Sequence, residues 1–357
     1  MRPARLCRFR HVATWTLRVR NSSTLEEAQA SLIDEATEVS SSLKAYHEVR
    51  PTISIVIATR GRPDSLRQCL ESILECNCAP HEIIVVDSAS RDPHASERVA
   101  KASGAAFIQT KFPGAAYARN LGALAASGDI VAFTDDDCLV DANWIEALME
   151  GFRSDSIDAS VGPIILKGSD PPVAMGVAAN FQPLTDAVRF CRTDADWFNR
   201  LAFGSVGFGA NLAVRRSSFL QFGMFRACLG AGAPIPGDEN YYLVCVVSRG
   251  GIVCNFPYAR VTHPVQLKSR VQELNQGGLA YVLFLLFTQP HLWRGITSRM
   301  FRRVARTRNQ VGKDANFRAE HRRFSDVTRM VLKTPSLLLS AWQVSRSLPK
   351  ISPPNSP

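Results

Sequence analysis

The feature that most constrains the fold is the alternation, from Ile53 onward, of short apolar runs with stretches of helical periodicity. The first run, Ile53–Thr59, is continuous and rich in β-branched residues, which is typical of a strand buried on both faces. Similar runs follow at Glu82–Asp87, Ala106–Gln109 and Asp129–Thr134. Strands that alternate with helices form βα units. We therefore predict an α/β fold with a mainly parallel central sheet and flanking helices.

The segments between these runs carry helix signals. We predict a helix after the first strand, capped by Asp64 or Ser65, with apolar side chains on one face. An alanine-rich helix is expected over Pro113–Ser127, with Gly128 as its C-cap. Glycine and proline interrupt the pattern in the second half, where a helical pattern returns at Glu239–Ser248.

Polar residues end several of the predicted strands. Ligands of an open parallel sheet bind at the carboxyl ends of its strands, so Thr59, Arg60 and Asp87 should gather with Asp135–Asp137 at one edge. Three consecutive aspartates offer the hard oxygen ligands that Mg²⁺ or Mn²⁺ prefers, and such a cation can neutralise a diphosphate. Like charges directly after a buried strand repel one another, which favours a bound cation over a solvated acidic loop.

Other phosphate-binding motifs are missing from the sequence. No G-x-G-x-x-G follows the first strand, and no G-x-x-x-x-G-K-[ST] occurs. A dinucleotide-binding fold and a P-loop fold are therefore not supported.

These elements, in this order, resemble the family 2 glycosyltransferases of GT-A fold. The resemblance implies an inverting transfer of a sugar from a nucleotide-diphosphate donor, most often a UDP-sugar, to a hydroxyl acceptor. It is carried by Pro51–Arg60, Val85–Asp92, Pro113–Gly122, Asp135–Asp137, Gly209–Arg216, Gly237–Asn240 and His263.

The resemblance implies a nucleotide pocket. Asp87 would accept hydrogen bonds from the base, and Thr59 and Arg60 would line the same pocket. Arg119 would lie near the base or the diphosphate, and Asp135 would contact the ribose and also share in the metal site.

It also implies a metal site and a sugar side. Asp137 would bind the metal, Mn²⁺ or Mg²⁺, and His263 would complete the environment of the metal and the diphosphate. Asp136 could replace either neighbouring aspartate. Asn211 and Arg215 would lie on the side of the acceptor and the donor sugar.

Two adjacent acids, Asp238 and Glu239, are candidates for the general base. The family usually has Glu followed by Asp here, whereas this chain has the reverse order. Counting forward to the glycines that end the following helix places Glu239 in register with the family's catalytic acid. Both acids also suit a helix N-terminus, where each stabilises the helix dipole by roughly 0.3–1 kcal/mol.

Two alternative functions are open at this point. A sugar-phosphate nucleotidyltransferase shares the sheet architecture, but it would need a glycine-rich loop that Thr59–Pro63 does not provide. The other alternative is a non-catalytic protein with a degenerate transferase core whose basic arms bind a membrane or nucleic acid.

Charge divides the chain into three parts. The net charge is +10, and arginines crowd the start of the chain, Arg2–Arg20, and the segment Arg294–Lys333. We predict a basic, helical N-terminal arm (1–50), a GT-A domain (51–265) and a basic helical extension with a disordered tail (266–357). Short apolar runs beside clustered arginines favour helices on an anionic membrane surface, which would suit a lipid-linked or polysaccharide acceptor. A solvated basic face is the alternative, and no nucleic-acid recognition motif accompanies the charge.

Cysteine usage and hydropathy indicate the compartment. The nine cysteines are irregularly spaced without a C-x-x-C pair, which argues against a disulfide framework. We expect no signal peptide, and the longest apolar run, Leu279–Phe287, is shorter than the roughly twenty residues of a membrane span. These features predict a cytoplasmic protein, peripheral on the inner face of the cell membrane if its arms bind lipid.

Overall fold

The computed structural model describes residues 51–154, 156–166, 174–175, 187–194, 197–202, 206–264, 280–293 and 335–347. The predicted N-terminal arm (1–50), the arginine-rich segment Arg294–Lys333 and the proline-rich tail lie outside the described residues. The predictions made for them, and the predicted domain boundaries, therefore stay predictions.

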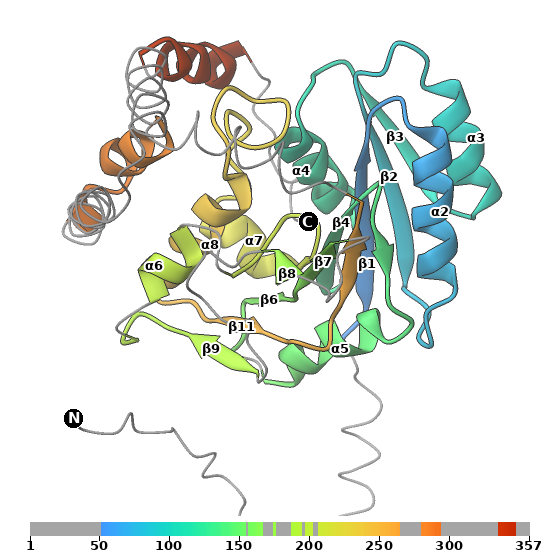
Figure 1. Ribbon diagram of the computed structural model, residues 1–357, viewed down its shortest axis with the longest axis horizontal. Coiled ribbons are helices and arrows are strands. Elements are labelled where there is room, and N and C mark those ends of the chain that lie inside the picture. Colours follow the sequence, from blue (N-terminus) through green and yellow to red (C-terminus); the bar gives the residue numbers. More distant parts are fainter. Residues whose placement is uncertain are drawn as a thin grey trace, which may run out of the picture. The chain divides into compact units, whose positions relative to one another are not determined.

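Within the described residues, an eight-stranded sheet forms the centre of the fold, in the order β3-β2-β1-β4-β10-β6-β11-β9 (Figure 1). The neighbours β3, β2, β1 and β4 are all parallel. Strand β10 runs antiparallel to both β4 and β6, β6 and β11 are parallel, and β9 is antiparallel to β11. The predicted α/β fold with a mainly parallel sheet is confirmed. The strands are β1 (Ile53–Thr59), β2 (Glu82–Ser88), β3 (Ala106–Thr110), β4 (Ile130–Asp135), β6 (Ala159–Val161), β9 (Val188–Phe190), β10 (Leu212–Arg215) and β11 (Val253–Asn255).

A smaller sheet and the helices complete the described fold. The small sheet has the order β5-β12-β7-β8. Its strands are β5 (Leu139–Val140), β7 (Ile164–Leu166), β8 (Ala174–Met175) and β12 (Val261–His263). The helices are α2 (Pro63–Leu74), α3 (His94–Ala102), α4 (Ala115–Ala125), α5 (Trp144–Glu150), α6 (Trp197–Ala202), α7 (Arg216–Phe222), α8 (Asp238–Ser248) and the short 3₁₀ helices η1 (Gly151–Arg153) and η2 (Pro290–Leu292). Residues 280–288 and 335–347 are also helical.

Strand β1 is buried along its whole length because both faces of the sheet are covered. Its side chains alternate between two cores. Ile55 packs in one core with Leu66 of α2, and Val56 packs in the other with Ala118 of α4. All four side chains are fully buried, as the continuous β-branched run predicted.

The start of α2 and the end of α4 differ from the predictions. Arg62, not Asp64 or Ser65, is the residue before the first turn of α2, and no side chain caps that turn. Pro63 begins the helix instead, because its fixed φ suits the first helical position. Helix α4 ends at an extended alanine two residues before Gly128, so Gly128 is not its C-cap.

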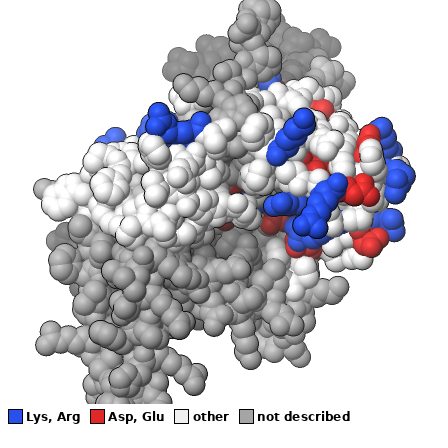
Figure 2. All heavy atoms as spheres, turned by 90° about the horizontal axis from the view of Figure 1, so that it is seen from above, with Lys and Arg blue, Asp and Glu red and all other residues white. Residues whose placement is uncertain are grey.

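The outer surface of α2 and α3 is charged but balanced. Figure 2 shows Lys and Arg side chains interspersed with Asp and Glu side chains on this side of the molecule. Exposed ion pairs join Arg67 to Asp64 on α2 and Lys101 to Glu97 on α3. No helix in the described part of the chain combines the length and hydrophobicity that crossing a bilayer requires.

Candidate active site

The three aspartates lie at the carboxyl edge of the parallel strands, as predicted. Asp135 ends β4 and lies opposite Ala58 of β1 in the register, while Thr59 lies opposite Asp87 of β2. The chain then turns sharply, because the backbone N–H of Cys138 donates to the carbonyl of Asp135 at 3.1 Å. The side chains that end three neighbouring strands are thereby brought to one edge of the sheet.

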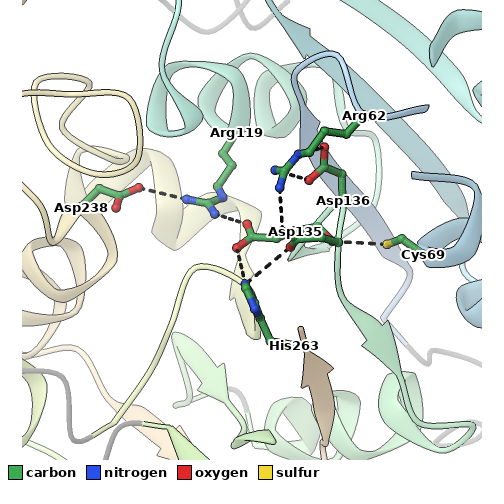
Figure 3. A network of polar contacts seen from close by, with 8 residues as sticks. Arg62, Cys69, Arg119, Asp135, Asp136, Asp238 and His263 are labelled. Atoms are coloured by element: carbon green, nitrogen blue, oxygen red, sulfur yellow. Dashed lines mark hydrogen bonds and ion pairs between the residues drawn. The ribbon is translucent and has the colours of Figure 1, made fainter. Parts of the chain in front are cut away.

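Strand β12 brings His263 to the same place. It pairs antiparallel with β5, which directly follows the aspartate turn. His263 Nε2 lies 3.5 Å from Asp137 Oδ1 and 4.0 Å from Asp135 Oδ2 (Figure 3). The ligand atoms of these three residues and of Cys138 all lie within 4.8 Å of one another. These three predicted metal residues are therefore close enough to share one cation. Carboxylates and an imidazole suit a divalent cation such as Mn²⁺.

Asp136 faces away from this group. Its Oδ2 accepts a hydrogen bond from Thr59 Oγ1 at 2.7 Å, and its Oδ1 lies 2.5 Å from Arg62 Nη2. Burial raises the pKa of Asp136 to about 6, although Thr59 and Arg62 favour the charged form. The prediction that Asp136 could replace either neighbouring aspartate does not fit this orientation.

Arg62 is a site residue that the sequence reasoning missed. Besides Asp136, it binds Asp137, with 2.6 Å between Nη1 and Oδ2. The predicted Arg60 has an exposed side chain. The available signal was that Arg62, like Arg60, follows the first predicted strand, whose end was expected at the same edge as the three aspartates.

Arg119 joins the aspartate turn to helix α8. Its Nη1 donates to Asp238 Oδ2 at 3.1 Å, and its Nη2 binds Asp135 Oδ1 (Figure 3). Burial disfavours its charge, but the carboxylates of Asp135 and Asp238 outweigh that effect and raise the pKa of Arg119 above its usual range. Gly209 leaves the necessary room, since a Cβ there would lie 2.7 Å from Arg119 Nη1. Arg119 therefore occupies a buried position between two acids.

The two acids at the start of α8 have different surroundings. Asp238 is buried, and burial together with neighbouring Glu239 raises its pKa, which Arg119 opposes. Gly230 has a φ of +93°, and a Cβ there would lie 2.4 Å from Asp238 Oδ1. Glu239 is partly exposed. Of the pair, Glu239 is therefore the carboxylate that an acceptor can reach more easily.

The carboxylate of Asp87 is bound by the loop that follows β2. It accepts hydrogen bonds from the backbone N–H of Ser90 at 3.0 Å and from Ser90 Oγ at 2.5 Å. Ala89, between them in the loop, has a φ of +58°. The position at the end of β2 fits the predicted pocket, while contact with a nucleotide base stays a prediction.

Asn211 lies in a buried structural network instead of facing a sugar. Its Nδ2 donates to the carbonyls of Ala259 at 2.7 Å and Pro163 at 2.9 Å. Its Oδ1 accepts a hydrogen bond from Trp144 Nε1 at 2.9 Å. Both amide protons are therefore used to connect the two sheets, which does not fit the predicted sugar-side role.

Arg215 lies at the opposite edge of the sheet. Because β10 runs antiparallel to β4, Arg215 lies opposite Ile130, at the far end of β4 from Asp135. Its guanidinium group donates to the carbonyls of Ile157 at 2.9 Å and Phe152 at 3.1 Å. The predicted contact of Arg215 with the acceptor or donor sugar does not fit this position.

The curated proteins to which this chain is similar include several that are named as glycosyltransferases. The Haloferax volcanii low-salt glycan biosynthesis hexosyltransferase Agl6 is 31% identical over 139 residues, which cover 37% of this chain and 33% of that protein. The glucosyl-dolichyl phosphate glucuronosyltransferase of the same organism is 26% identical over 121 residues, covering 32% of this chain and 38% of that protein. The matched part thus spans less than half the length of either relative.

Solved structures of glycosyltransferases are also similar. The mannosyltransferase PcManGT from Pyrobaculum calidifontis, in complex with GDP-Man and Mn²⁺, has a TM-score of 0.49 and 16% identity, covering 84% of this chain and 88% of that chain. GalNAc-T7 with UDP, GalNAc and Mn²⁺ has a TM-score of 0.48 and 19% identity, covering 66% and 48%.

A family model identifies the domain. Residues 54–220 match the model described as glycosyl transferase family 2. The match includes Arg119 and the aspartate turn and ends before Asp238, Glu239 and His263. The assignment of these last three residues to the site therefore rests on their geometry alone. The mixed sheet with flanking helices is the GT-A-type architecture that the sequence resemblance implied. Residues 54–220 therefore form a glycosyl transferase family 2 domain.

Proposed function

We propose that this protein is a metal-dependent inverting glycosyltransferase that moves a sugar from a UDP-sugar to a hydroxyl acceptor. The observation that carries the proposal is the position of Asp135, Asp137 and His263 at the carboxyl edge of the sheet, joined through Arg119 to Asp238. A divalent-cation group and a carboxylate pair at one site are the two parts that sugar transfer from a nucleotide diphosphate needs.

On the donor side, Asp135, Asp137 and His263 would hold Mn²⁺ or Mg²⁺. The cation, when bound, neutralises the diphosphate and stabilises the departing nucleoside diphosphate. Arg62 adds a positive charge beside Asp137, with which it forms an ion pair. Asp87, at the end of β2, would accept hydrogen bonds from the base.

On the acceptor side, Glu239 would take the proton of the attacking hydroxyl. The hydroxyl oxygen attacks the anomeric carbon as the bond to the diphosphate breaks, which inverts the configuration without a covalent enzyme intermediate. Asp238, held by Arg119, would position the start of α8 and hence Glu239. This assignment follows from the greater exposure of Glu239.

The acceptor would be lipid-linked or a polysaccharide, with the protein peripheral on the inner face of the membrane. The arginine-rich segment Arg294–Lys333 supports this part of the proposal by its composition. The relative named glucosyl-dolichyl phosphate glucuronosyltransferase is compatible with a lipid-linked acceptor.

The test is donor turnover by the full-length protein. Purified protein is incubated with a panel of UDP- and GDP-sugars and Mn²⁺, with and without chelator, and release of nucleoside diphosphate is measured. We expect slow metal-dependent hydrolysis of a UDP-sugar, with initial formation of the inverted anomer by NMR. Tight nucleotide binding without any turnover would favour the non-catalytic alternative, and a retained anomer would contradict the single displacement.

A further inference from the structure

A thiol belongs to the candidate metal group. Cys138 is fully buried, and its Sγ lies within 4.8 Å of the ligand atoms of Asp135, Asp137 and His263. The tight turn after β4 explains this position, because the hydrogen bond from Cys138 N–H to the Asp135 carbonyl brings the thiol back beside the carboxylates.

A second buried thiol provides a contrast. Cys69 of α2 donates from Sγ to the backbone carbonyl of Asp135 at 3.4 Å. It approaches the main chain of the turn and does not belong to the ligand group. Cys69 and Cys138 are thus two buried thiols beside the same aspartate, and only Cys138 is placed among the side-chain ligand atoms of the described residues.

Thiolate, imidazole and carboxylate ligands differ in the cations that they favour. Mg²⁺ prefers oxygen ligands and near-octahedral geometry, whereas Zn²⁺ and Co²⁺ accept sulfur and nitrogen. Two carboxylates, one imidazole and one thiolate would fill the four positions of a tetrahedral zinc site. A site filled by four protein ligands leaves no position open for a diphosphate.

We propose that Cys138 is a fourth ligand of this metal site and makes it select Zn²⁺ or Co²⁺ over Mg²⁺. The inference rests on the site assigned under the proposed function and deepens it. On binding, the Cys138 thiol loses its proton to solvent and the sulfur forms the bond to the cation. With Asp135, Asp137, His263 and Cys138 as its four ligands, bound Zn²⁺ would leave no position for the diphosphate and would compete with the donor.

The test is a Co²⁺ titration of the full-length wild type, Cys138→Ser and Cys69→Ser, all reduced with a phosphine. Sulfur bound to Co²⁺ gives a charge-transfer absorption in the near ultraviolet, which needs no donor or turnover. We expect the band in the wild type and in Cys69→Ser, and its loss in Cys138→Ser. Competition should show Zn²⁺ affinity falling at least ~10-fold in Cys138→Ser, the scale seen even for outer-shell changes, with Mg²⁺ affinity unchanged.

Three outcomes would overturn the inference. They are a band that persists in Cys138→Ser, Co²⁺ binding by the wild type without a band, and equal Zn²⁺ affinity in the wild type and Cys138→Ser. Cys138→Ala, which has no oxygen ligand, must repeat the Cys138→Ser result while retaining the wild-type circular dichroism. Mn²⁺-dependent donor turnover, measured on the same preparations, separates the two proposals. Donor turnover without the absorption band would contradict only the proposal that Cys138 is a ligand. The band without turnover would contradict only the transferase assignment.

Discussion

Arg119 and Asp238 form a buried ion pair across 119 positions of the sequence, with 3.1 Å between Nη1 and Oδ2. The same guanidinium group binds Asp135, so one cation serves an acid of the aspartate turn and an acid of α8. The metal side and the base side of the site are therefore connected through a single side chain.

Arg119→Gln should strongly destabilise the protein. The change leaves two acids without their buried cation, and breaking a buried pair costs about 3–5 kcal/mol. Denaturant unfolding measures this loss. Arg67→Gln is the control, because Arg67 pairs with Asp64 on the exposed surface of α2 and should cost at most ~1 kcal/mol. Equal losses in the two variants would contradict the role given to Arg119.

Glu239→Gln should abolish transfer while donor binding survives. We expect a loss in kcat of at least ~10²-fold, the usual scale for a general base, with unchanged UDP affinity. Asp238→Asn should instead reduce stability, because Asp238 is buried against Arg119. If Asp238→Asn folds normally and is inactive while Glu239→Gln transfers sugar, the two assignments must be exchanged.

Donor binding should require the metal and Asp137. Without a cation, the carboxylates of the turn face the diphosphate as like charges. Isothermal titration with UDP should show binding with Mn²⁺ and none with chelator or in Asp137→Ala. Asp136→Asn is a matched control, because its carboxylate faces Arg62 and Thr59. UDP affinity that survives in chelator would remove the metal from the proposal.

Asp136 should make the metal-free protein less stable as pH rises from about 4 to about 6. Burial raises its pKa from 3.8 to about 6, so the folded state keeps a proton that the unfolded state has already lost. Since the unfolded state binds fewer protons in this window, the free energy of unfolding falls with rising pH. A shift of this size corresponds to roughly 3 kcal/mol.

The measurement for Asp136 compares two pH profiles of stability. Wild type and Asp136→Asn are unfolded with denaturant in chelator, and the difference between their free energies is plotted against pH. The wild type should lose stability relative to Asp136→Asn across the window. A flat difference, or one of opposite sign, would show that Arg62 keeps the carboxylate charged throughout.

The strands and the position of the acids could be predicted from the sequence because the physics there is local. A continuous apolar run such as Ile53–Thr59 needs cover on both faces, and a parallel arrangement then brings Asp87 and Asp135 to one edge. The contacts between distant residues could not be predicted this way. Nothing in the residues around Arg119 indicates that it also pairs with Asp238.

The remote position of Arg215 follows from the topology, whereas Asn211 comes just before Leu212 and lies at the same edge of the sheet as the aspartate turn. Asn211 and Arg215 were assigned to the site because their motif resembles one that lies there in the family. The antiparallel direction of β10 instead puts Arg215 opposite Ile130, at the remote edge. The alternation of strands and helices predicted parallel pairing, and periodicity alone does not reveal that β10 and β9 run antiparallel to their neighbours.

The place of β10 also has a consequence for synthesis of the chain. Strand β4 is fully apolar from Ile130 to Phe133, and its free edge is covered by Leu212–Arg215, about eighty positions later. Until residues 212–215 have been synthesised, this edge of β4 is unpaired. Two nascent chains can then associate through their unpaired β4 edges. Fragments that stop before Leu212 should therefore aggregate. In the longer chain, β10 pairs with the edge of β4 and prevents pairing between chains.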